Sequence, residues 1–229
     1  VGKAIALALA QAGADVAINY HSSAAAAMTT VAEIEALGRR AAAIRADVAQ
    51  GRQVKALVDE AVARLGRLDV LVNSASLWRK TPWAELDEAA WDQLVDIALK
   101  GPFLCAKAAA PHLTAHGDGA IINIVDLSAF VPFPNFMPHS AAKAGLVNLT
   151  YALAMELAPA VRVNAIAPGP VLPPPDYTDA QVQTVAKHTL LGRWGTAADV
   201  AQAVIFLAQA PYITGVVLPV DGGEHLARR

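Results

Sequence analysis

The hydrophobic positions of the chain fall into two alternating patterns. Short apolar runs rich in valine, isoleucine and alanine have the length of strands that are buried on both faces. Between them, longer alanine-rich segments repeat their apolar residues with the period of a helix. The predicted strands cover residues 14–20, 41–48, 68–75, 119–126, 161–169 and 216–223. The predicted helices cover residues 2–12, 24–37, 51–65, 88–114, 139–158 and 197–208.

This alternation predicts the fold class. Each predicted strand follows a predicted helix at intervals of roughly thirty residues, the size of a strand–helix–strand unit. Crossover helices of this kind join parallel strands. We therefore expect an α/β fold, a Rossmann-like doubly wound parallel sheet flanked by helices, in a single domain over residues 1–229. Hydrophobic residues make up 55% of the chain and charged residues 17%, which fits a sheet covered on both faces.

The first residues, VGKAIALALAQAGA, form a predicted helix with no strand before it. A doubly wound nucleotide-binding domain begins with a strand and a glycine-rich turn, which place phosphates at the N-terminus of the first helix. That strand is central in the usual order, so its loss leaves two half-sheets with unpaired inner edges. We therefore expect that this strand and the Gly-rich loop precede Val1 in the natural protein. Gly2 is then expected to be the last glycine of the loop.

Charge and cysteine content narrow the classes of partner and compartment. The formal net charge is −2 and no run of lysine or arginine occurs, so nucleic acid and membrane surfaces are not expected partners. The longest uncharged stretch, 127–142, contains three prolines and is not a membrane helix, and no signal peptide is expected. Cys105 is the single cysteine, which fits a reducing compartment. Together these features predict a cytoplasmic protein that acts on a small molecule. The histidines lack metal-ligand spacing, so no metal is expected.

Residues at the ends of the predicted strands are candidates for cofactor binding, because ligands bind there in open α/β sheets. The first predicted strand ends in Tyr20, His21, Ser22 and Ser23. No acid is present there to bind a ribose 2′-hydroxyl, which favours NADP(H) over NAD(H), although a plain polar turn is the alternative. After the second strand, Asp47 and Val48 are placed to meet an adenine ring, and an N-cap is the other interpretation of Asp47.

Two further strand ends carry small residues and prolines. Asn73, Ala75 and Ser76 end the third predicted strand, and Trp78 follows two residues later. Small residues are expected where a chain passes close to a cofactor. The segment Pro168, Gly169, Pro170 and Val171 predicts a rigid turn whose backbone groups hold a planar amide.

A histidine and a lysine lie four residues apart in the segment PHSAAKAG. His139 and Lys143 therefore share one face of the predicted helix, and Asp126 at the end of strand 119–126 is expected to complete the group. Either the group transfers protons at a ligand, or the pair packs at the start of a buried helix. Asp126 carries the proton in place of His139 if burial raises the pKa of its carboxyl.

The order of these features resembles the short-chain dehydrogenase/reductase family over essentially the whole chain. The matching stretches are VGKAIALALA, LVNSAS, KGPFLCAKAAAP, IINIVD, HSAAK at the place of the family's YxxxK, VRVNAIAPGPV and YITGVVLPVDGG. Within the family the chain is most similar to pteridine reductases and dihydromonapterin reductases, since Asp126 stands where most members have serine. The resemblance implies that Ser76, Trp78 and Pro170 face the substrate.

Two departures from the family bear on activity. His139 replaces the catalytic tyrosine and Ala98 replaces an asparagine that orders a proton-relay water, whereas Lys143 is retained. Imidazole is a competent general acid or base, although it is shorter than a phenol. Loss of one general acid costs about 10²–10⁴ in rate.

The expected function is an NADPH-dependent reductase of a pterin-like or other small carbonyl or imine substrate. Two alternatives remain open, namely a catalytically impaired nucleotide-binding pseudoenzyme and an enoyl- or dienoyl-thioester reductase. The resemblance also implies that the loop 171–196 covers the substrate. It further implies a homo-oligomer, a dimer or a tetramer, which uses the helices at 88–114 and 139–158 and the terminal strand.

Overall fold

The computed structural model describes residues 1–174 and 177–227. Its strands are β1 (Val16–Tyr20), β2 (Ala41–Arg45), β3 (Val70–Asn73), β4 (Gly119–Ile124), β5 (Val161–Pro168) and β6 (Val217–Val220). Its α-helices are α1 (Gly2–Gln11), α2 (Ala24–Ala36), α3 (Gly51–Leu65), α4 (Glu88–Val95), α5 (Gly101–Thr114), α6 (Met137–Leu157), α7 (Asp179–Ala186) and α8 (Ala197–Gln209). The predicted α/β fold with a parallel sheet is confirmed.

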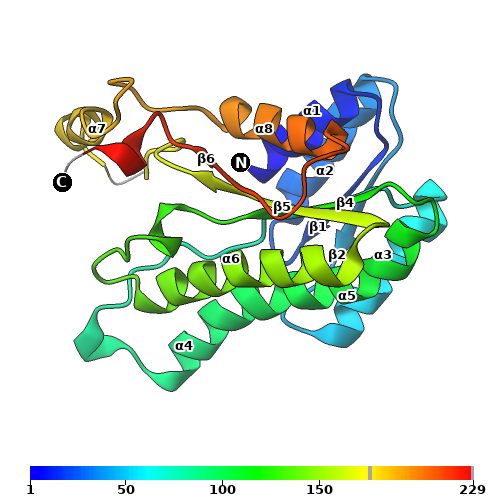
Figure 1. Cartoon of the computed structure of the whole chain (residues 1–229), viewed down its shortest axis with the longest axis horizontal. Helices are drawn as coiled ribbons and strands as arrows, with labels where there is room; N and C mark the ends of the chain where they lie inside the picture. The colour runs from blue at the N-terminus through cyan, green and yellow to red at the C-terminus, as the bar shows by residue number, and fades with distance from the viewer. Residues whose placement is uncertain (175–176, 228–229) are drawn as a thin grey trace.

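Helices cover both faces of the sheet. In Figure 1, α1 and α8 lie on one side of the strands, and α5 and α6 lie on the other. The hydrophobic core therefore has two parts, one on each face of the sheet. Ile122 and Ile166 pack toward α8, and the neighbouring Ile121 and Val163 pack toward α5 and α6. Central strands with both faces buried explain why these segments read as continuous apolar runs in the sequence.

The sheet consists of two parts, of which one has the order β1-β2 and the other β3-β4-β5-β6. Within the described residues, β1 pairs only with β2, and β3 pairs only with β4. β1 and β3 therefore each keep one edge without a partner strand, as the sequence predicts. A cavity of about 760 Å³ lies between these edges, lined by both strands and by residues of α1, α3 and α5.

All strands run parallel, so their carboxyl ends lie at one edge of the molecule. This edge lies toward α7 and the C-terminus in Figure 1. Several strands are shorter at this edge than predicted, because polar side chains bond to the local backbone and end the ladder. Asp47 and Val48, for example, lie beyond β2, where the Asp47 carboxylate accepts a hydrogen bond from the Ala49 N–H at 2.9 Å.

The predicted helix 88–114 is three segments, with a π-helical turn at Asp96–Lys100 between α4 and α5. Pro102 lies in the first turn of α5, and its ring nitrogen cannot donate to the carbonyl four residues earlier. Gly101 instead donates to the carbonyl of Asp96, five residues back. Ala98, which the resemblance places where an asparagine is expected, lies buried in this turn.

The predicted loop 171–196 contains the helix α7, so that prediction was wrong over residues 179–186. Thr178 and Gln181 form a capping box at its start. The T-x-x-Q pattern is a recognised signal for a helix start and is present in the sequence. None of the helices in the described ranges combines the length and hydrophobicity that crossing a membrane requires.

Candidate active site

Asp126, His139 and Lys143 lie together at the carboxyl end of β4. Asp126 lies two residues beyond the end of β4, while the other two residues lie one turn apart in α6. The His139 Nε2 atom is 2.6 Å from the Asp126 Oδ2 atom, and Lys143 Nζ donates to the Ile124 carbonyl at 2.7 Å. His139 and Lys143 are only 2% and 4% exposed, whereas the Asp126 side chain is 21% exposed. The carboxylate is therefore the member of the group that is most open to a ligand.

The Asp126 carboxylate is held from both sides. The hydroxyl and the backbone N–H of Ser128 donate to its Oδ1 atom at 2.5 and 2.8 Å. Burial raises the pKa of Asp126, but the hydrogen bond from His139, the charges of His139 and Lys143 and the Ser128 hydroxyl outweigh it. The net effect lowers the pKa. Asp126 was expected to take over the proton from His139 only if burial raises its pKa, and this condition is not met, because its hydrogen-bond donors stabilise the carboxylate.

The His139 ring has a defined orientation. An ionised carboxylate can only accept hydrogen bonds, so Nε2 carries a hydrogen and donates it to Asp126. Among the described residues, the buried Nδ1 atom has no hydrogen-bond partner. The Lys143 ammonium is also buried, and burial lowers its pKa against the opposing effect of the Asp126 charge. The site thus concentrates one anion and two nitrogen groups in a space of low dielectric.

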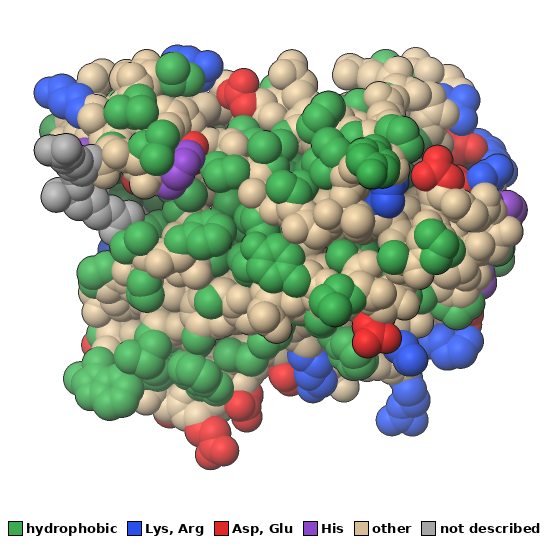
Figure 2. Space-filling view, in the orientation of Figure 1, with side chains coloured by type: hydrophobic (Ala, Val, Ile, Leu, Met, Phe, Trp, Pro, Cys, Tyr) green, Lys and Arg blue, Asp and Glu red, His purple; other side chains and the backbone are tan. Residues whose placement is uncertain are grey.

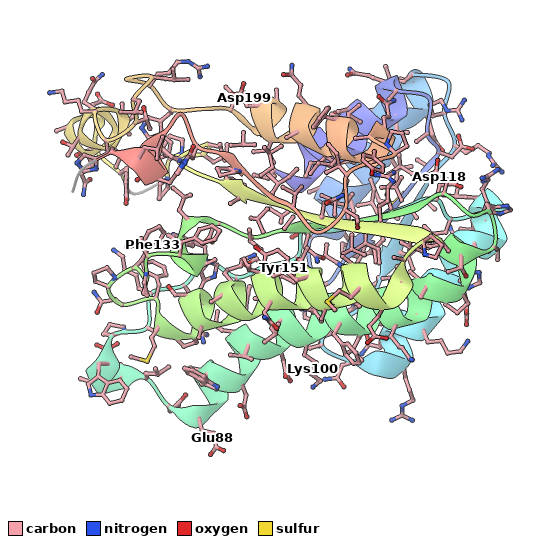
Figure 3. The ribbon with its side chains drawn as sticks, in the orientation of Figure 1. Glu88, Lys100, Asp118, Phe133, Tyr151 and Asp199 are labelled. Carbon is pink, nitrogen blue, oxygen red and sulfur yellow. The ribbon has the colours of Figure 1, made fainter. Side chains whose placement is uncertain are left out.

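An aromatic cluster adjoins this group. The Trp78 indole stacks on Phe136 with ring centroids 4.2 Å apart and lies edge-on to His139 at 5.1 Å. Phe133 lies edge-on to Trp78 at 6.2 Å, and Figure 3 labels it on the loop between β4 and α6. Trp78 itself is 55% exposed. Sequence reasoning identified Trp78 but missed Phe133, Phe136 and Ser128, because only the folded loops bring them together.

A buried hydrogen-bond chain supports the strand ends. The Asn73 amide donates to the Asn123 side chain, which donates to Thr150, each at 2.9 Å. This chain links β3, β4 and α6 beneath the candidate site. The side-chain NH2 group of Asn73, a residue predicted to meet a cofactor, is therefore engaged inside the protein.

The predicted cofactor residues lie along the same edge. His21, Ser22 and Ser23 are exposed in the turn after β1, and Tyr20 ends that strand. Ala75 and Ser76 are also exposed. Asp47 does not cap α3, whose N-cap is Gln50, so the alternative interpretation of Asp47 was wrong.

Some backbone groups of the turn at 168–171 already form hydrogen bonds within the protein. Gly169 donates to the Val220 carbonyl at 3.0 Å, and the Pro170 carbonyl accepts from Gly195 at 2.9 Å. A Cβ at Gly169 would lie 2.6 Å from Asp221, so only glycine fits. Pro168 is buried and Val171 is half-buried, and fewer backbone groups remain open here than the sequence suggests.

Features of this edge fit a nicotinamide dinucleotide. The N-terminus of α1 has no side-chain cap, and Gly2 there lies beside Ser74, at the end of β3. A helix N-terminus of this kind attracts a phosphate. The Lys143 ammonium lies at the other end of the edge, where the ribose of such a cofactor needs a polar group.

Comparisons with known proteins agree with this geometry. The family described as enoyl-(acyl carrier protein) reductase matches residues 1–225. The 3-oxoacyl-(acyl-carrier-protein) reductase FabG of Staphylococcus aureus strain Mu50 is 40% identical over 99% of this chain and 94% of its own length. The cis-4-hydroxycyclohexanecarboxylate dehydrogenase of Sinomonas cyclohexanicum is 40% identical over 97% of this chain and 91% of its own.

A solved structure extends the similarity to three dimensions. The blue fluorescent protein from a metagenomic library, in complex with NADPH, superposes with a TM-score of 0.89. It is 34% identical and the match covers 97% of this chain and 92% of that one. The relatives named here are not pteridine reductases, which bears on the substrate.

Proposed function

Because the chain belongs to the short-chain dehydrogenase/reductase family, we propose that it reduces a ketone to a secondary alcohol with NADP(H), reversibly. The observation that carries this proposal is the Asp126–His139 pair, 2.6 Å apart, beside Lys143 at the carboxyl edge of the sheet. The names of both enzymes compared above, an oxoacyl reductase and a hydroxyacid dehydrogenase, support chemistry at a carbon that bears oxygen.

The edge of the sheet would hold the cofactor through groups already described. The N-terminus of α1 suits the pyrophosphate, and the Lys143 ammonium suits a ribose. The turn at 20–23 has no acid, and its serine hydroxyls and His21 suit a 2′-phosphate, which supports NADP(H) over NAD(H). When bound, the nicotinamide supplies the hydride.

Proton transfer is assigned to the Asp126–His139 pair. In the reduction direction the carbonyl carbon receives the hydride, and its oxygen takes a proton from the pair. Asp126 is the more exposed member and would relay the proton: when His139 is an imidazolium, its Nε2 proton passes to the Asp126 carboxylate as Asp126 gives a proton to the substrate oxygen, which leaves a carboxylate and a neutral imidazole. The pair then regains a proton from water. Lys143 stabilises the negative charge that develops on the oxygen.

A pterin-like substrate is the second candidate, and the exposed Trp78 favours it, since a flat heterocycle stacks well on indole. A nucleotide-binding pseudoenzyme and a dienoyl-thioester reductase are the remaining outcomes of the test. NADPH and NADH are first titrated against the protein. NADPH consumption is then followed with acetoacetyl-CoA, 4-oxocyclohexanecarboxylate, dihydrobiopterin and a dienoyl-CoA.

We expect tighter binding of NADPH and turnover of at least one of the two ketones. Binding without any turnover would identify a pseudoenzyme, and turnover of dihydrobiopterin alone would identify the pterin substrate. Failure to bind either cofactor would overturn the enzyme proposal.

We also propose that the protein forms a homo-oligomer. Figure 2 shows hydrophobic side chains gathered over the face formed by α6, where Figure 3 labels Tyr151. Met155 is 83% exposed, and Phe103 on α5 and Tyr151 are nearly half exposed. Exposed apolar patches of this kind mark interfaces. Light scattering of wild type and Met155→Lys tests the proposal, because a charge there should dissociate the assembly.

A further inference from the structure

Two loops beside the candidate site are joined by one residue. Thr81, on the loop between β3 and α4, donates its N–H to the Asn135 carbonyl at 2.7 Å and its hydroxyl to the same oxygen at 3.2 Å. Thr81 is 6% exposed, whereas residues 75–80 before it are exposed. It is therefore a buried anchor in an otherwise exposed loop.

The partner residue has an unusual backbone. Asn135 has a φ of 64°, in the left-handed region that asparagine tolerates and β-branched residues do not. The position of its carbonyl oxygen depends on that conformation. We call the Thr81–Asn135 contact the clasp.

Aromatic residues flank the clasp on both loops. Trp78 lies three residues before Thr81, and Phe136 directly follows Asn135. Their rings stack at 4.2 Å, and the indole lies edge-on to His139. The clasp thus joins the two backbones that carry this aromatic pair.

We propose that Thr81 and Asn135 are positioning residues, which hold the Trp78–Phe136 pair against His139 as one wall of the active site. The expected effect of the clasp on turnover rests on the proposed function, whereas its expected effect on the position of Trp78 does not. Trp78 is more than half exposed, while His139 beneath it is nearly fully buried. A loosened indole would therefore misplace the substrate and let water reach the proton-transferring pair.

We expect the fold to persist without the clasp. β3 and β4 pair through four residues and α6 packs on β5, and these contacts lie outside the clasp. Substitutions in the clasp should therefore leave the unfolding midpoint close to that of wild type, and the active-site effect can be measured in a folded protein.

The first test uses a matched pair at Asn135. Asn135→Gly keeps the left-handed conformation available, whereas Asn135→Val opposes it. We expect Val to raise the KM for 4-oxocyclohexanecarboxylate or acetoacetyl-CoA about tenfold with a smaller change in kcat, and Gly to stay within about twofold. Equal kinetics for both variants would overturn the proposal.

The second test acts on the other partner. Thr81→Val removes the hydroxyl but keeps the N–H, and Thr81→Ser keeps both. We expect Val to raise KM about threefold and Ser to restore it, since one hydrogen bond of moderate strength is lost. Thr29→Val is the control, because the Thr29 hydroxyl bonds only within α2, to the Ala25 carbonyl.

A readout without turnover separates the two proposals. The near-ultraviolet circular dichroism of Trp78 is isolated by subtracting the spectrum of Trp78→Phe. Asn135→Val should diminish this signal, and Asn135→Gly should preserve it. If wild type turns over no ketone but the signal responds in this way, the proposed function fails and the clasp stands. A signal unchanged in Asn135→Val would overturn the clasp, whatever the activity.

Discussion

The ends of β4 and β1 lie at the same edge of the sheet but hold their polar groups differently. After β4, the buried side chains of Ser128, His139 and Lys143 bond to Asp126 or to backbone. After β1, the side chains at 21–23 are exposed in a turn. The two ends therefore suit different tasks. Proton transfer needs fixed distances, whereas recognition of a phosphate tolerates groups that the ligand itself orders.

This difference predicts how substitutions should act. A change in the buried group leaves a partner unsatisfied at low dielectric, so its effect on the reaction should be large. A change in the exposed turn should alter only the choice of cofactor.

The largest effect is expected at the buried pair. His139→Gln keeps a hydrogen-bond donor near Asp126 but cannot exchange protons, so kcat for ketone reduction should fall about 10²–10⁴-fold. The cofactor dissociation constant should change little. His112→Gln is the control, since His112 lies on α5 away from the pair. Equal losses in both variants would remove His139 from the chemistry.

The next effect is expected at Lys143. Lys143→Ala removes the ammonium from the proposed ribose site, so the dissociation constant for NADPH should rise on the order of 10–100-fold, as the loss of a charged hydrogen bond predicts. Isothermal titration measures it directly. Lys107→Ala, at an exposed position of α5, should bind NADPH like wild type. Unchanged binding in Lys143→Ala would contradict the assigned role.

The exposed end of β1 should give a smaller and more selective effect. Tyr20→Asp introduces a carboxylate that can bind a 2′-hydroxyl and repels a 2′-phosphate, so the ratio of kcat/KM for NADPH over NADH should fall about tenfold. Tyr20→Asn, whose side chain has the shape of aspartate but no charge, should shift the ratio less. Parallel shifts in both variants would place the 2′-phosphate elsewhere.

The smallest effect concerns acid stability. The folded pKa of Asp126 is lowered, so its contribution to stability is present above the unfolded value of about 3.9 and is lost as pH falls through the folded pKa. At neutral pH, Asp126→Asn should be less stable than wild type by about 1–3 kcal/mol. Urea unfolding should show this gap narrowing below pH ~4. A constant gap would mean that the carboxylate charge contributes nothing.

Much of the fold could be predicted from the sequence, because strands buried on both faces leave apolar runs such as 119–124 and 161–168. The strand ends could not, since they depend on local bonds such as that of Asp47 to Ala49. The π-helical turn at 96–100 could not be predicted either, because a single turn of this kind has no hydrophobic period of its own.

The sequence indicated which residues form the candidate site, but not the pKa or the hydrogen bonds of Asp126. Spacing alone brings His139 and Lys143 to one face of α6. The lowered pKa of Asp126 depends on Ser128 and His139, which only the folded chain places around it. The clasp joins residues 54 positions apart in sequence and leaves no pattern at all.

The pH dependence of kcat for NADPH-driven ketone reduction, compared between wild type and His139→Tyr, tests the central claim most directly. If the Asp126–His139 pair delivers the proton, the substitution should change both the rate and its pH profile, because a phenol then replaces the imidazole as the group beside Asp126 that exchanges protons. Superimposable profiles for the two proteins would contradict the claim and return His139 to a packing role.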